Sequence, residues 1–387
     1  MKIVFYGLSL GPPWVEGLRN TVRSLSKRLV EKGFEVSVLT KSPRQEVFEG
    51  VRYVGLNIGG EAYSENAPTT LAAIARWIWL NSASFDIVHG HSSFPLIALP
   101  GILAKTPCVF TLYSPLDAAG RFIGDTSLTQ KIALRFSKGP IPTLLAAPKV
   151  NFVAISEGVR KSLPRALNSR SQVIPVGVEF DRFSRRIETE HLRSELDLDF
   201  DELVLFAGDA TPWKGGEDFL TAASIVLKER RRVGFLFLTK GTYEHEQERL
   251  AALKNMSVRL GLAKNIRFLG RRKDIEAVYK LSDIVVLPYR TMFSFMSTPL
   301  SLLEAMSAAR PIVASRTGDI PVIIDHMENG VLFEPGDTRA IALNILLLLN
   351  NRTLAERLGD AAGRTAKFYD WDNVVKEYVN LYRKIRH

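Results

Sequence analysis

The stretch DIVVLPYRTMFSFMSTPLSLLEAMSAARPIVAS, residues 283–315, has the pattern of a strand, a loop, a helix and a second strand. Its two strand-like runs are continuously apolar, which is typical of parallel strands that are buried on both faces. Between them, Thr298 followed by Pro299 predicts a helix start, with the threonine as N-cap and the proline in the first turn. One acid, Glu304, lies in this apolar helix beside Leu300. Such a carboxylate is either a solvated helix acid, a capping group or a ligand-binding group, and in the last case a vicinal diol such as a ribose would suit it.

The same alternation of apolar strands and amphipathic helices runs through the whole chain. KIVFY is followed by a helical pattern that carries Leu18, Val22, Leu25 and Leu29 and ends before Gly33. Further strand-like runs are EVSVLT, DIVHGH, CVFTLY, NFVAIS and QVIPVG in the first half, and LVLFAG, GFLFLT and IRFLG in the second. The pattern predicts the α/β class, with a doubly wound parallel sheet built twice.

The domain boundary is predicted near residue 180. At 387 residues the chain is long enough for two domains. Residues 178–202 are charged and lack strand character until LVLFAG begins. We therefore expect one Rossmann-like domain over 1–180 and a second over 181–370. The amphipathic segment 371–387 is expected to return to the first domain.

Composition indicates an ordinary globular protein, with 46% hydrophobic and 24% charged residues. The single cysteine, Cys108, lies in an apolar run and is predicted to be buried. The N-terminal MKIVFYGLSLG lacks the long apolar stretch of a signal peptide, and no apolar run reaches the length of a membrane-spanning helix. We expect a cytoplasmic protein, with a peripheral position on the cytoplasmic membrane face as a further expectation.

The positive charge is concentrated in the first half of the chain. Residues 1–180 hold 20 Lys and Arg against 12 Asp and Glu, whereas residues 181–387 hold 31 against 29. This excess indicates either an anionic partner, such as a phospholipid surface or a phosphorylated acceptor, or a solvated surface that is simply basic. No nucleic-acid-binding signature is present, so nucleic acid is not an expected partner. The run WIWL, residues 77–80, is either an interfacial patch or part of a buried aromatic helix.

Several classes of site are disfavoured by the motifs that the sequence lacks. It has no P-loop, no dinucleotide fingerprint, no nucleophile elbow and no HExxH motif. The acidic run DLDFD, residues 197–201, precedes a strand and is interpreted as a solvated connection. His89 and His91 end a predicted strand, where open α/β sheets bind ligands, but no further His or Cys cluster supports a metal. We expect them either to line a site or to be structural.

The second half carries a candidate anion site. In FAGDATPWKGGEDFL a strand ends at Gly208, and Lys214 precedes two glycines and a helix. Backbone N–H groups at a helix start and a nearby ammonium both favour anions.

An ordered set of motifs makes the chain recognisable. GDATPWKG, FLGRRKDIEAVYKLSDIVVLPYR, PLSLLEAMSAARPIVAS and GDIPVIIDHMENGVLFEPGD follow one another in the second half. WVEGLRNTVRSLSKRLVEKGFEVSVLT, DIVHGH, FVAISEGVRKSL and IPVGVEFDRF precede them. Together they resemble the retaining glycosyltransferases of family 4, which have the GT-B fold of two Rossmann-like domains facing a cleft. The resemblance covers nearly the whole chain.

The resemblance implies a nucleoside diphosphate sugar donor in the C-terminal domain and a glycan or lipid-linked acceptor in the N-terminal domain, without a metal or other cofactor. Glu304 matches the family's second glutamate, which holds the donor ribose, and Lys214 matches the lysine on the donor diphosphate. Gly17 matches the glycine loop that faces those phosphates. Lys214, Glu304 and His91 are the catalytic candidates. The full predicted set for the donor is Gly17, Gly208, Lys214, Arg271, Tyr289, Thr298, Pro299, Leu300 and Glu304, and for the acceptor His91 and Tyr113.

The chain departs from the family pattern at three positions. Met296 stands where the first glutamate is expected, Asp209 where an arginine partners the lysine, and Tyr113 where a site histidine is expected. The replacement candidates are His91 for the histidine, and Arg290, Arg271 or Arg316 for the arginine.

The predicted activity is transfer of a hexose-type unit to an acceptor with retention at the anomeric carbon. One alternative is another GT-B enzyme, such as a sugar-nucleotide epimerase or a sugar phosphorylase. The other is a catalytically degenerate protein that binds a nucleotide sugar or a partner enzyme.

Overall fold

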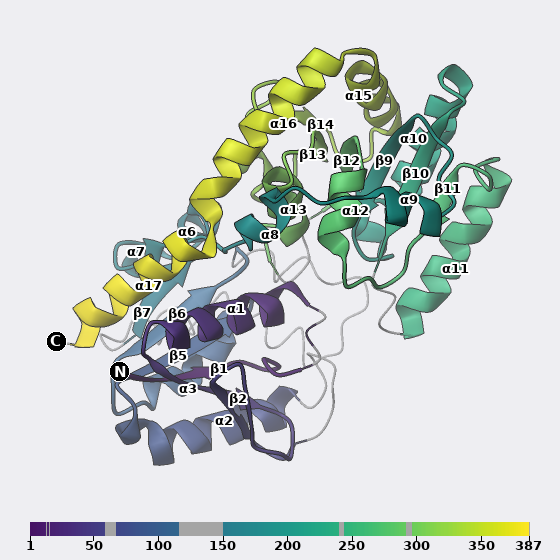
Figure 1. Cartoon of the computed structure of the whole chain (residues 1–387). Coiled ribbons are helices and arrows are strands. Elements are labelled where there is room, and N and C mark those ends of the chain that lie inside the picture. Colours follow the sequence, from purple (N-terminus) through teal and green to yellow (C-terminus); the bar gives the residue numbers. More distant parts are fainter. Residues whose placement is uncertain are drawn as a thin grey trace. The chain divides into compact units, whose positions relative to one another are not determined.

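The computed structural model describes residues 1–12, 14, 16–58, 67–115, 150–239, 244–291 and 296–386. These residues form two compact units (Figure 1). The first contains the described parts of 1–177, together with 296–298 and 371–386. The second contains those of 178–291 and 299–370.

The first unit alternates strands and helices, as the apolar runs predict. Its strands are β1 (Lys2–Tyr6), β2 (Glu35–Thr40), β3 (Glu46–Phe48), β4 (Val51–Gly55), β5 (Ile87–Ser92), β6 (Cys108–Leu112), β7 (Val150–Ala154) and β8 (Gln172–Val173). Its helices are α1 (Gly17–Glu31), α2 (Ala67–Asn81), α3 (Leu99–Ile102), α6 (Glu157–Lys161), α7 (Arg165–Asn168) and α17 (Trp371–Arg386), with 3-10 turns at Ser82–Ser84 and Pro95–Ala98.

The strands of the first unit form a sheet in the order β3-β4-β2-β1-β5-β6-β7-β8. β1 pairs in parallel with both β2 and β5, so the strand order reverses between β1 and β5. The expectation of a purely parallel sheet is wrong at one edge, because β3 pairs with β4 in the antiparallel sense. Cys108 is buried, as predicted, and burial raises the pKa of its thiol to about 12. Gly33 has a φ of 83°, as a residue that ends a helix in the left-handed region does.

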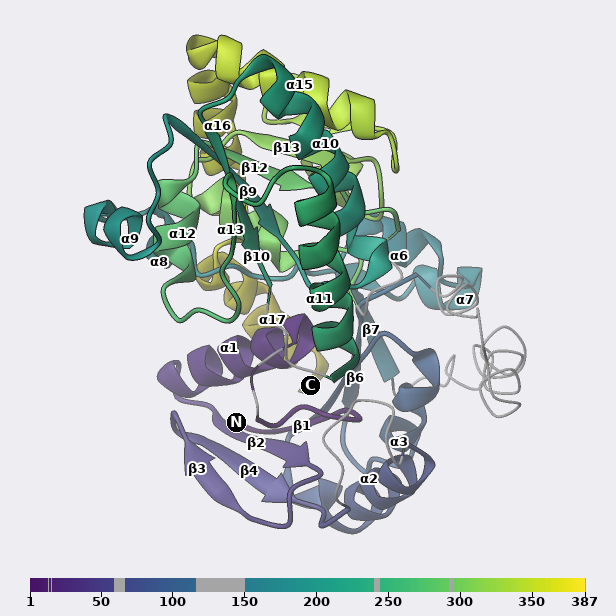
Figure 2. The same cartoon turned by 90° about the vertical axis from the view of Figure 1, so that its right-hand side faces the viewer.

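The C-terminal helix α17 packs within the first unit, beside α1 in both Figure 1 and Figure 2. Its inner face buries Val375, Tyr378 and Tyr382. The Tyr382 hydroxyl lies 2.6 Å from Nδ1 of His89 on β5, so the contact joins residues 293 positions apart.

The second unit repeats the alternation. Its strands are β9 (Glu202–Ala207), β10 (Val233–Leu238), β11 (Ile266–Phe268), β12 (Ile284–Leu287), β13 (Ile312–Ser315) and β14 (Val331–Phe333). Its helices are α8 (Phe180–Ser184), α9 (Glu190–Glu195), α10 (Gly216–Glu229), α11 (Glu244–Arg259), α12 (Ile275–Leu281), α13 (Leu300–Ser307), α14 (Ile320–Ile323), α15 (Thr338–Asn350) and α16 (Arg352–Ala366). Short 3-10 turns lie at Pro212–Lys214 and Lys367–Tyr369.

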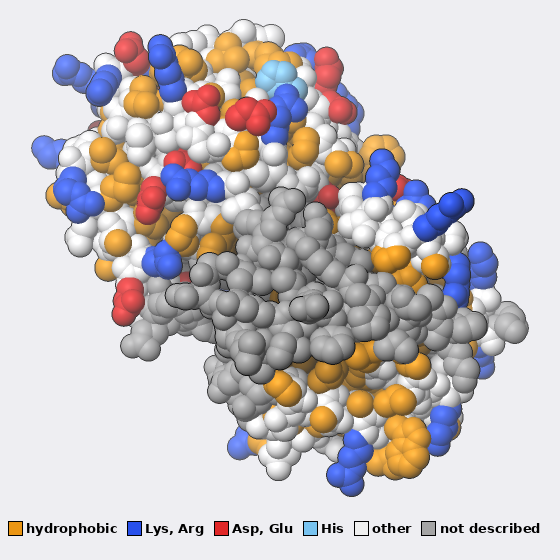
Figure 3. Space-filling view, turned by 180° about the vertical axis from the view of Figure 1, so that it is seen from behind, with side chains coloured by type: hydrophobic (Ala, Val, Ile, Leu, Met, Phe, Trp, Pro, Cys, Tyr) orange, Lys and Arg blue, Asp and Glu red, His pale blue; other side chains and the backbone are white. Residues whose placement is uncertain are grey.

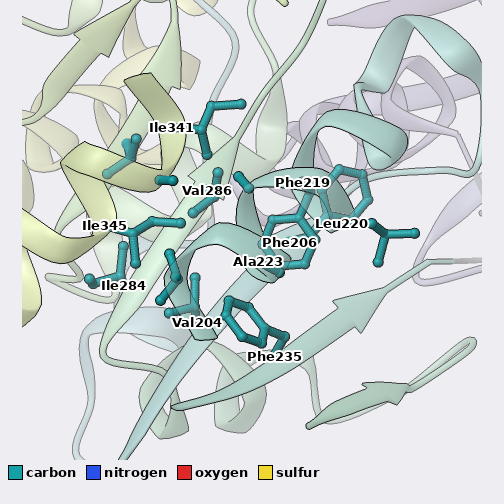
Figure 4. Packing of buried hydrophobic residues seen from close by; sticks show 14 of the residues in the cluster. Val204, Phe206, Phe219, Leu220, Ala223, Phe235, Ile284, Val286, Ile341 and Ile345 are labelled. Carbon is teal, nitrogen blue, oxygen red and sulfur yellow. The ribbon is translucent and has the colours of Figure 1, made fainter. Parts of the chain in front are cut away.

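The second sheet is parallel, in the order β11-β10-β9-β12-β13-β14. Its strands are buried on both faces because helices pack on each side. Figure 4 shows Val204 and Phe206 of β9 packed with Phe219 of α10 and Ile341 and Ile345 of α15. The rigid strands fix the positions of the loops that follow them.

The predicted start of α13 needs correction. The helix begins at Leu300, and Pro299 occupies the cap position with extended backbone angles, φ −70° and ψ 129°. Thr298 therefore lies before the cap position. Because Pro299 itself has extended rather than helical backbone angles, the helix begins one residue later than predicted.

Candidate functional site

The candidate donor site of the second unit lies where its strand order reverses. β9 pairs with both β10 and β12, and the chain runs outward to opposite edges from these two central strands. In open α/β sheets, ligands bind beyond the carboxyl ends of the strands at such a point. Gly208 directly follows β9, and Tyr289 follows β12.

Lys214 is held at the end of a tight turn that leads into α10. Its N–H donates to the carbonyl of Thr211 at 3.0 Å. Gly215, the next residue, has a φ of 70°, and a Cβ there would lie 1.9 Å from the carbonyl oxygen of Pro288. Both the left-handed backbone and this close approach require glycine. The turn after β9 thus fits against the loop after β12.

The aromatic ring of Tyr289 contacts the side chain of Lys214. The ammonium of Lys214 lies 4.1 Å from the centre of the tyrosine ring, within cation–π distance. The Tyr289 hydroxyl donates to the carbonyl of Ala207 at 2.8 Å and lies 2.7 Å from the hydroxyl of Ser301. The ring is buried, and burial raises the pKa of its hydroxyl. Tyr289 thus connects β9, the loop after β12 and α13.

Glu304 lies half-buried on α13, one turn after Ser301. The hydroxyl of Tyr279 on α12 donates to Oε2 of Glu304 at 2.9 Å. The same hydroxyl lies 3.4 Å from the carbonyl of Ser301. Burial raises the pKa of Tyr279, and the Glu304 charge raises it further, so this hydroxyl stays protonated and remains a donor. The carboxylate is therefore held by a neutral partner.

Lys214 and Glu304 consequently belong to one neighbourhood of the second unit. Lys214 contacts Tyr289, which contacts Ser301, and Ser301 lies one turn before Glu304 on α13. The sequence identified both charged residues as candidates, but it did not predict the contacts through Tyr289 and Ser301 that link them.

Arg290, a candidate for the missing arginine, forms an ion pair instead. Its Nε and one terminal nitrogen both donate at 2.7 Å to the carboxylate of Asp218, in the first turn of α10. Asp218 is 4% exposed and the Arg290 side chain 45%. The bonds to Asp218 raise the pKa of Arg290. The Arg290 N–H also donates to the carbonyl of Trp213 at 2.8 Å, so this residue ties both loops together.

The other candidate cations have different surroundings. Arg316 pairs with Glu334 at 3.4 Å. Arg271 is exposed in the loop after β11. Asp209, which stands at the expected arginine position, accepts from both the N–H and the hydroxyl of Thr211. Its carboxylate closes the turn that leads to Lys214.

In the first unit, Gly17 begins α1, as the sequence predicts. His91 and Tyr113 are both fully buried, and the Tyr113 hydroxyl lies 3.0 Å from Nδ1 of His91. Burial lowers the pKa of His91 to about 3, so the imidazole is neutral. Its Nε2 has no hydrogen-bond partner among the residues that the structure describes.

Residues 296–298 also belong to the first unit. Ser297 donates its N–H to the carbonyl of Tyr113 at 2.8 Å, and Met296 and Thr298 are buried. Pro299 and Leu300 belong to the second unit. The predicted donor contacts of Thr298, Pro299 and Leu300 remain predictions.

The acidic run at 197–201 is accounted for by ion pairs. Arg232 binds Asp199 and Asp201 at 3.2 and 3.0 Å, and Arg267 lies 3.6 Å from Asp197. Within the described part of the chain, no group of three or more His, Cys, Asp or Glu residues could hold a metal ion. The side chains of Asp197 and Asp199 are 97% and 93% exposed, so this run is a solvated connection, as interpreted from the sequence.

Sequence reasoning missed three residues of the site: Asp218, Tyr279 and Ser301. Asp218 could have been noticed as an acid in a first helical turn, where the helix dipole favours it. Nothing local in the sequence marks Tyr279 or Ser301 as partners of Glu304 and Tyr289.

Comparison with known proteins identifies the family. Residues 15–182 match the model described as Glycosyltransferase Family 4, and residues 201–351 match the model described as Glycosyl transferases group 1. This chain is a family 4 glycosyltransferase. The resemblance seen in its motifs is thereby confirmed.

Two relatives of this glycosyltransferase span nearly its full length. The D-inositol 3-phosphate glycosyltransferase of Corynebacterium urealyticum is 23% identical over 393 residues, covering 95% of this chain and 91% of the relative. The phosphatidyl-myo-inositol mannosyltransferase of Mycobacterium leprae is 27% identical over 380 residues, covering 95% and 93%.

Solved structures show the fold of this glycosyltransferase to be GT-B. Sucrose-phosphate synthase from Thermosynechococcus elongatus superposes with a TM-score of 0.81 at 19% identity, covering 99% of this chain and 98% of that one. Anabaena HepE in complex with UDP-glucose gives 0.78 at 18% identity, covering 99% and 100%. Among the described residues of the chain, the structure contains no helix that is both long and apolar enough to cross a membrane.

Proposed function

We propose that this glycosyltransferase moves a hexose-type unit from a nucleoside diphosphate sugar to a lipid-linked or otherwise anionic acceptor, with retention and without a metal. The observation that carries the proposal is the grouping of Lys214, Tyr289, Ser301 and Glu304 at the strand reversal of the second unit. A cation at a helix start suits a diphosphate, and a carboxylate suits a ribose diol.

In this mechanism Lys214 neutralises the charge that develops on the leaving diphosphate. Because Tyr289 and the Gly215 turn already hold the lysine, its ammonium needs little reorganisation as the donor bond breaks. Glu304, held by Tyr279, orients the donor through its ribose hydroxyls. No protein nucleophile is assigned.

The acceptor class is proposed from charge and from the relatives. The first 180 residues carry an excess of eight positive charges, given their 20 Lys and Arg against 12 Asp and Glu. Relatives are named for inositol phosphate and phosphatidylinositol, which are both anionic. A phosphorylated or phospholipid-linked acceptor is consistent with both observations. His91 and Tyr113 are proposed to shape the acceptor side from within the core rather than by proton transfer.

The test is release of nucleoside diphosphate from UDP-, GDP- and ADP-sugars, measured with and without phosphorylated and lipid-linked acceptors. Lys214→Ala should lower turnover by roughly 100-fold or more, as loss of a transition-state charge partner does. Lys228→Ala, at an exposed lysine on α10, is the matched control and should retain full activity.

Unfolding of both variants in urea separates chemistry from stability. Intact turnover in Lys214→Ala would refute the diphosphate assignment. Tight nucleotide-sugar binding without release, for every donor and acceptor, would favour the degenerate binding protein. Release of an altered free sugar would favour an epimerase.

A further inference from the structure

We propose that the face formed by α2 and α3 in the first unit docks on an anionic lipid bilayer, and that the groove between these helices receives a hydrocarbon chain. The proposal deepens the proposed function and rests on it, because a lipid-linked acceptor is met at such a surface. Its basis is a groove, three exposed apolar side chains and a local surplus of positive charge.

The groove has a volume of about 520 Å³. Leu71 and Ala75 line it from α2, and Leu99 and Leu103 line it from α3 and the residue after that helix. All eight lining residues are apolar. A sugar or a phosphate would find no hydrogen-bond partner among these side chains, whereas a hydrocarbon chain would lose its contact with water.

Exposed apolar side chains lie on, or directly after, the same helices as the groove. Trp79 lies one helical turn beyond Ala75 on the same face of α2, since residues four apart are neighbours on a helix. Trp79 is 56% exposed, Leu80 54% and Leu103 47%. Figure 3 shows hydrophobic side chains gathered beside Lys and Arg over the unit that contains these helices, near the lower edge of the view.

The run WIWL, residues 77–80, is interpreted from the sequence as either an interfacial patch or part of a buried helix, and the structure shows features of both. Ile78 is fully buried, and the Trp77 ring packs 5.8 Å from that of Phe85. Only Trp79 and Leu80 face outward.

Charge next to this apolar face favours an anionic surface. The Lys105 ammonium lies 5.9 Å from the centre of the Trp79 ring, and Arg76 is exposed on α2. Residues 67–84 and 95–107 contain no Asp or Glu. A tryptophan beside a lysine is a combination suited to the boundary between headgroups and acyl chains.

A second copy of the chain is a poorer occupant than a bilayer. A symmetric dimer through this face would bring the same patch of each copy together. Arg76 and Lys105 would then meet their own counterparts, and like charges across an interface oppose association. Anionic headgroups instead complement both cations, at about 1 kcal/mol for each basic residue near the surface.

The test is co-sedimentation of the full chain with vesicles of phosphatidylcholine alone or mixed with phosphatidylglycerol. The wild type should bind the mixed vesicles and bind neutral ones far more weakly. Trp79→Ala combined with Leu103→Ser should lower binding roughly tenfold, because two exposed side chains lose their burial in lipid. Lys105→Glu should lower binding to the mixed vesicles by a similar factor.

Matched controls lie in the second unit. Phe368→Ala removes an aromatic side chain that is 77% exposed, and Lys228→Glu reverses an exposed lysine. Both should bind vesicles as the wild type does. Thermal unfolding should be unchanged in every variant, since all the substituted side chains are exposed; if the Trp79 variant unfolds early, Leu80→Ser replaces it.

Equal binding to neutral and anionic vesicles, no binding at all, or undiminished binding by the Trp79 and Lys105 variants would overturn the proposal. A dimer that dissociates in the Trp79 variant, without vesicle binding, would also overturn it and assign the face to a second copy. Nucleotide-sugar binding in solution should be unaffected by these variants. Loss of vesicle binding is therefore distinguishable from failure of the proposed transfer reaction.

Discussion

Replacement of Arg290 by methionine should destabilise the second unit by about 2 kcal/mol. The carboxylate of Asp218 is 4% exposed, and its two bonds to Arg290 are both 2.7 Å long. Removing one partner of a fully buried pair costs about 3–5 kcal/mol, whereas an exposed pair contributes about 0–1 kcal/mol. Arg290 is 45% exposed, so this pair falls between these limits.

The measurement is urea unfolding, with the transition of the second unit followed by circular dichroism and the free energy of unfolding taken from linear extrapolation. Asp218→Asn keeps the shape of the side chain and should cost about 1 kcal/mol. The double variant should be at least as stable as Arg290→Met alone, because it no longer carries a buried unpaired acid. A coupling energy of about 1–2 kcal/mol is expected from the double-mutant cycle.

The same variants test whether the pair positions Lys214. Because the ion pair ties the start of α10 to the loop after β12, its loss should loosen the turn that holds Lys214 and lower turnover. An Arg290→Met protein within about 0.5 kcal/mol of the wild type would show that solvent screens the pair. A coupling energy near zero would equally refute the reasoning, since the two side chains would then act independently.

Two further predictions concern the buried hydroxyls and imidazoles. Tyr279→Phe removes the hydroxyl that donates a hydrogen bond to Glu304 at 2.9 Å. We expect the KM for the nucleotide sugar to rise several-fold in steady-state kinetics, with a smaller change in kcat. An unchanged KM would argue against a role of Glu304 in binding the nucleotide sugar. Burial lowers the folded-state pKa of His89 and His91, so the unfolded chain binds more protons and stability should fall as the pH drops below about 6.5, by up to about 2 kcal/mol per histidine at pH 5. Urea unfolding between pH 7 and pH 5 measures this loss, and His91→Gln should lessen its slope; a flat profile for the wild type would mean that the imidazoles take up protons without unfolding.

Much of the fold could be predicted because its strands are buried on both faces. In a continuous apolar run such as IVVL of β12, side chains on both faces of the strand are apolar. Both faces are buried when helices cover the two sides of a parallel sheet. The edge strand β3 escaped notice for the opposite reason. Its three residues are exposed, and a short exposed strand has no apolar pattern to distinguish it from a loop.

Only the charged residues of the candidate site could be predicted from the sequence, because their local surroundings mark them as binding groups. Lys214 could be inferred from its glycines and Glu304 from its apolar surroundings. The contacts that hold them come from distant parts of the chain: Arg290 and Asp218 are 72 residues apart, and Tyr279 and Glu304 are 25 apart. The local pattern of the sequence does not predict such pairs, because the two residues of each pair become neighbours only when the sheet forms.

The departure at Asp209 now has a physical explanation. An arginine at this position could not accept hydrogen bonds, whereas the Asp209 carboxylate accepts from the N–H and hydroxyl of Thr211 and so closes the turn before Lys214. The chain therefore has a more firmly defined turn in place of a second cation beside the lysine. The Arg290 charge nearby is offset by Asp218, which leaves Lys214 as the cation whose side chain lies over Tyr289. Under the proposed mechanism, we therefore expect stabilisation of the leaving diphosphate to depend more heavily on the Lys214 ammonium, among the described residues, than in a site with an arginine–lysine pair.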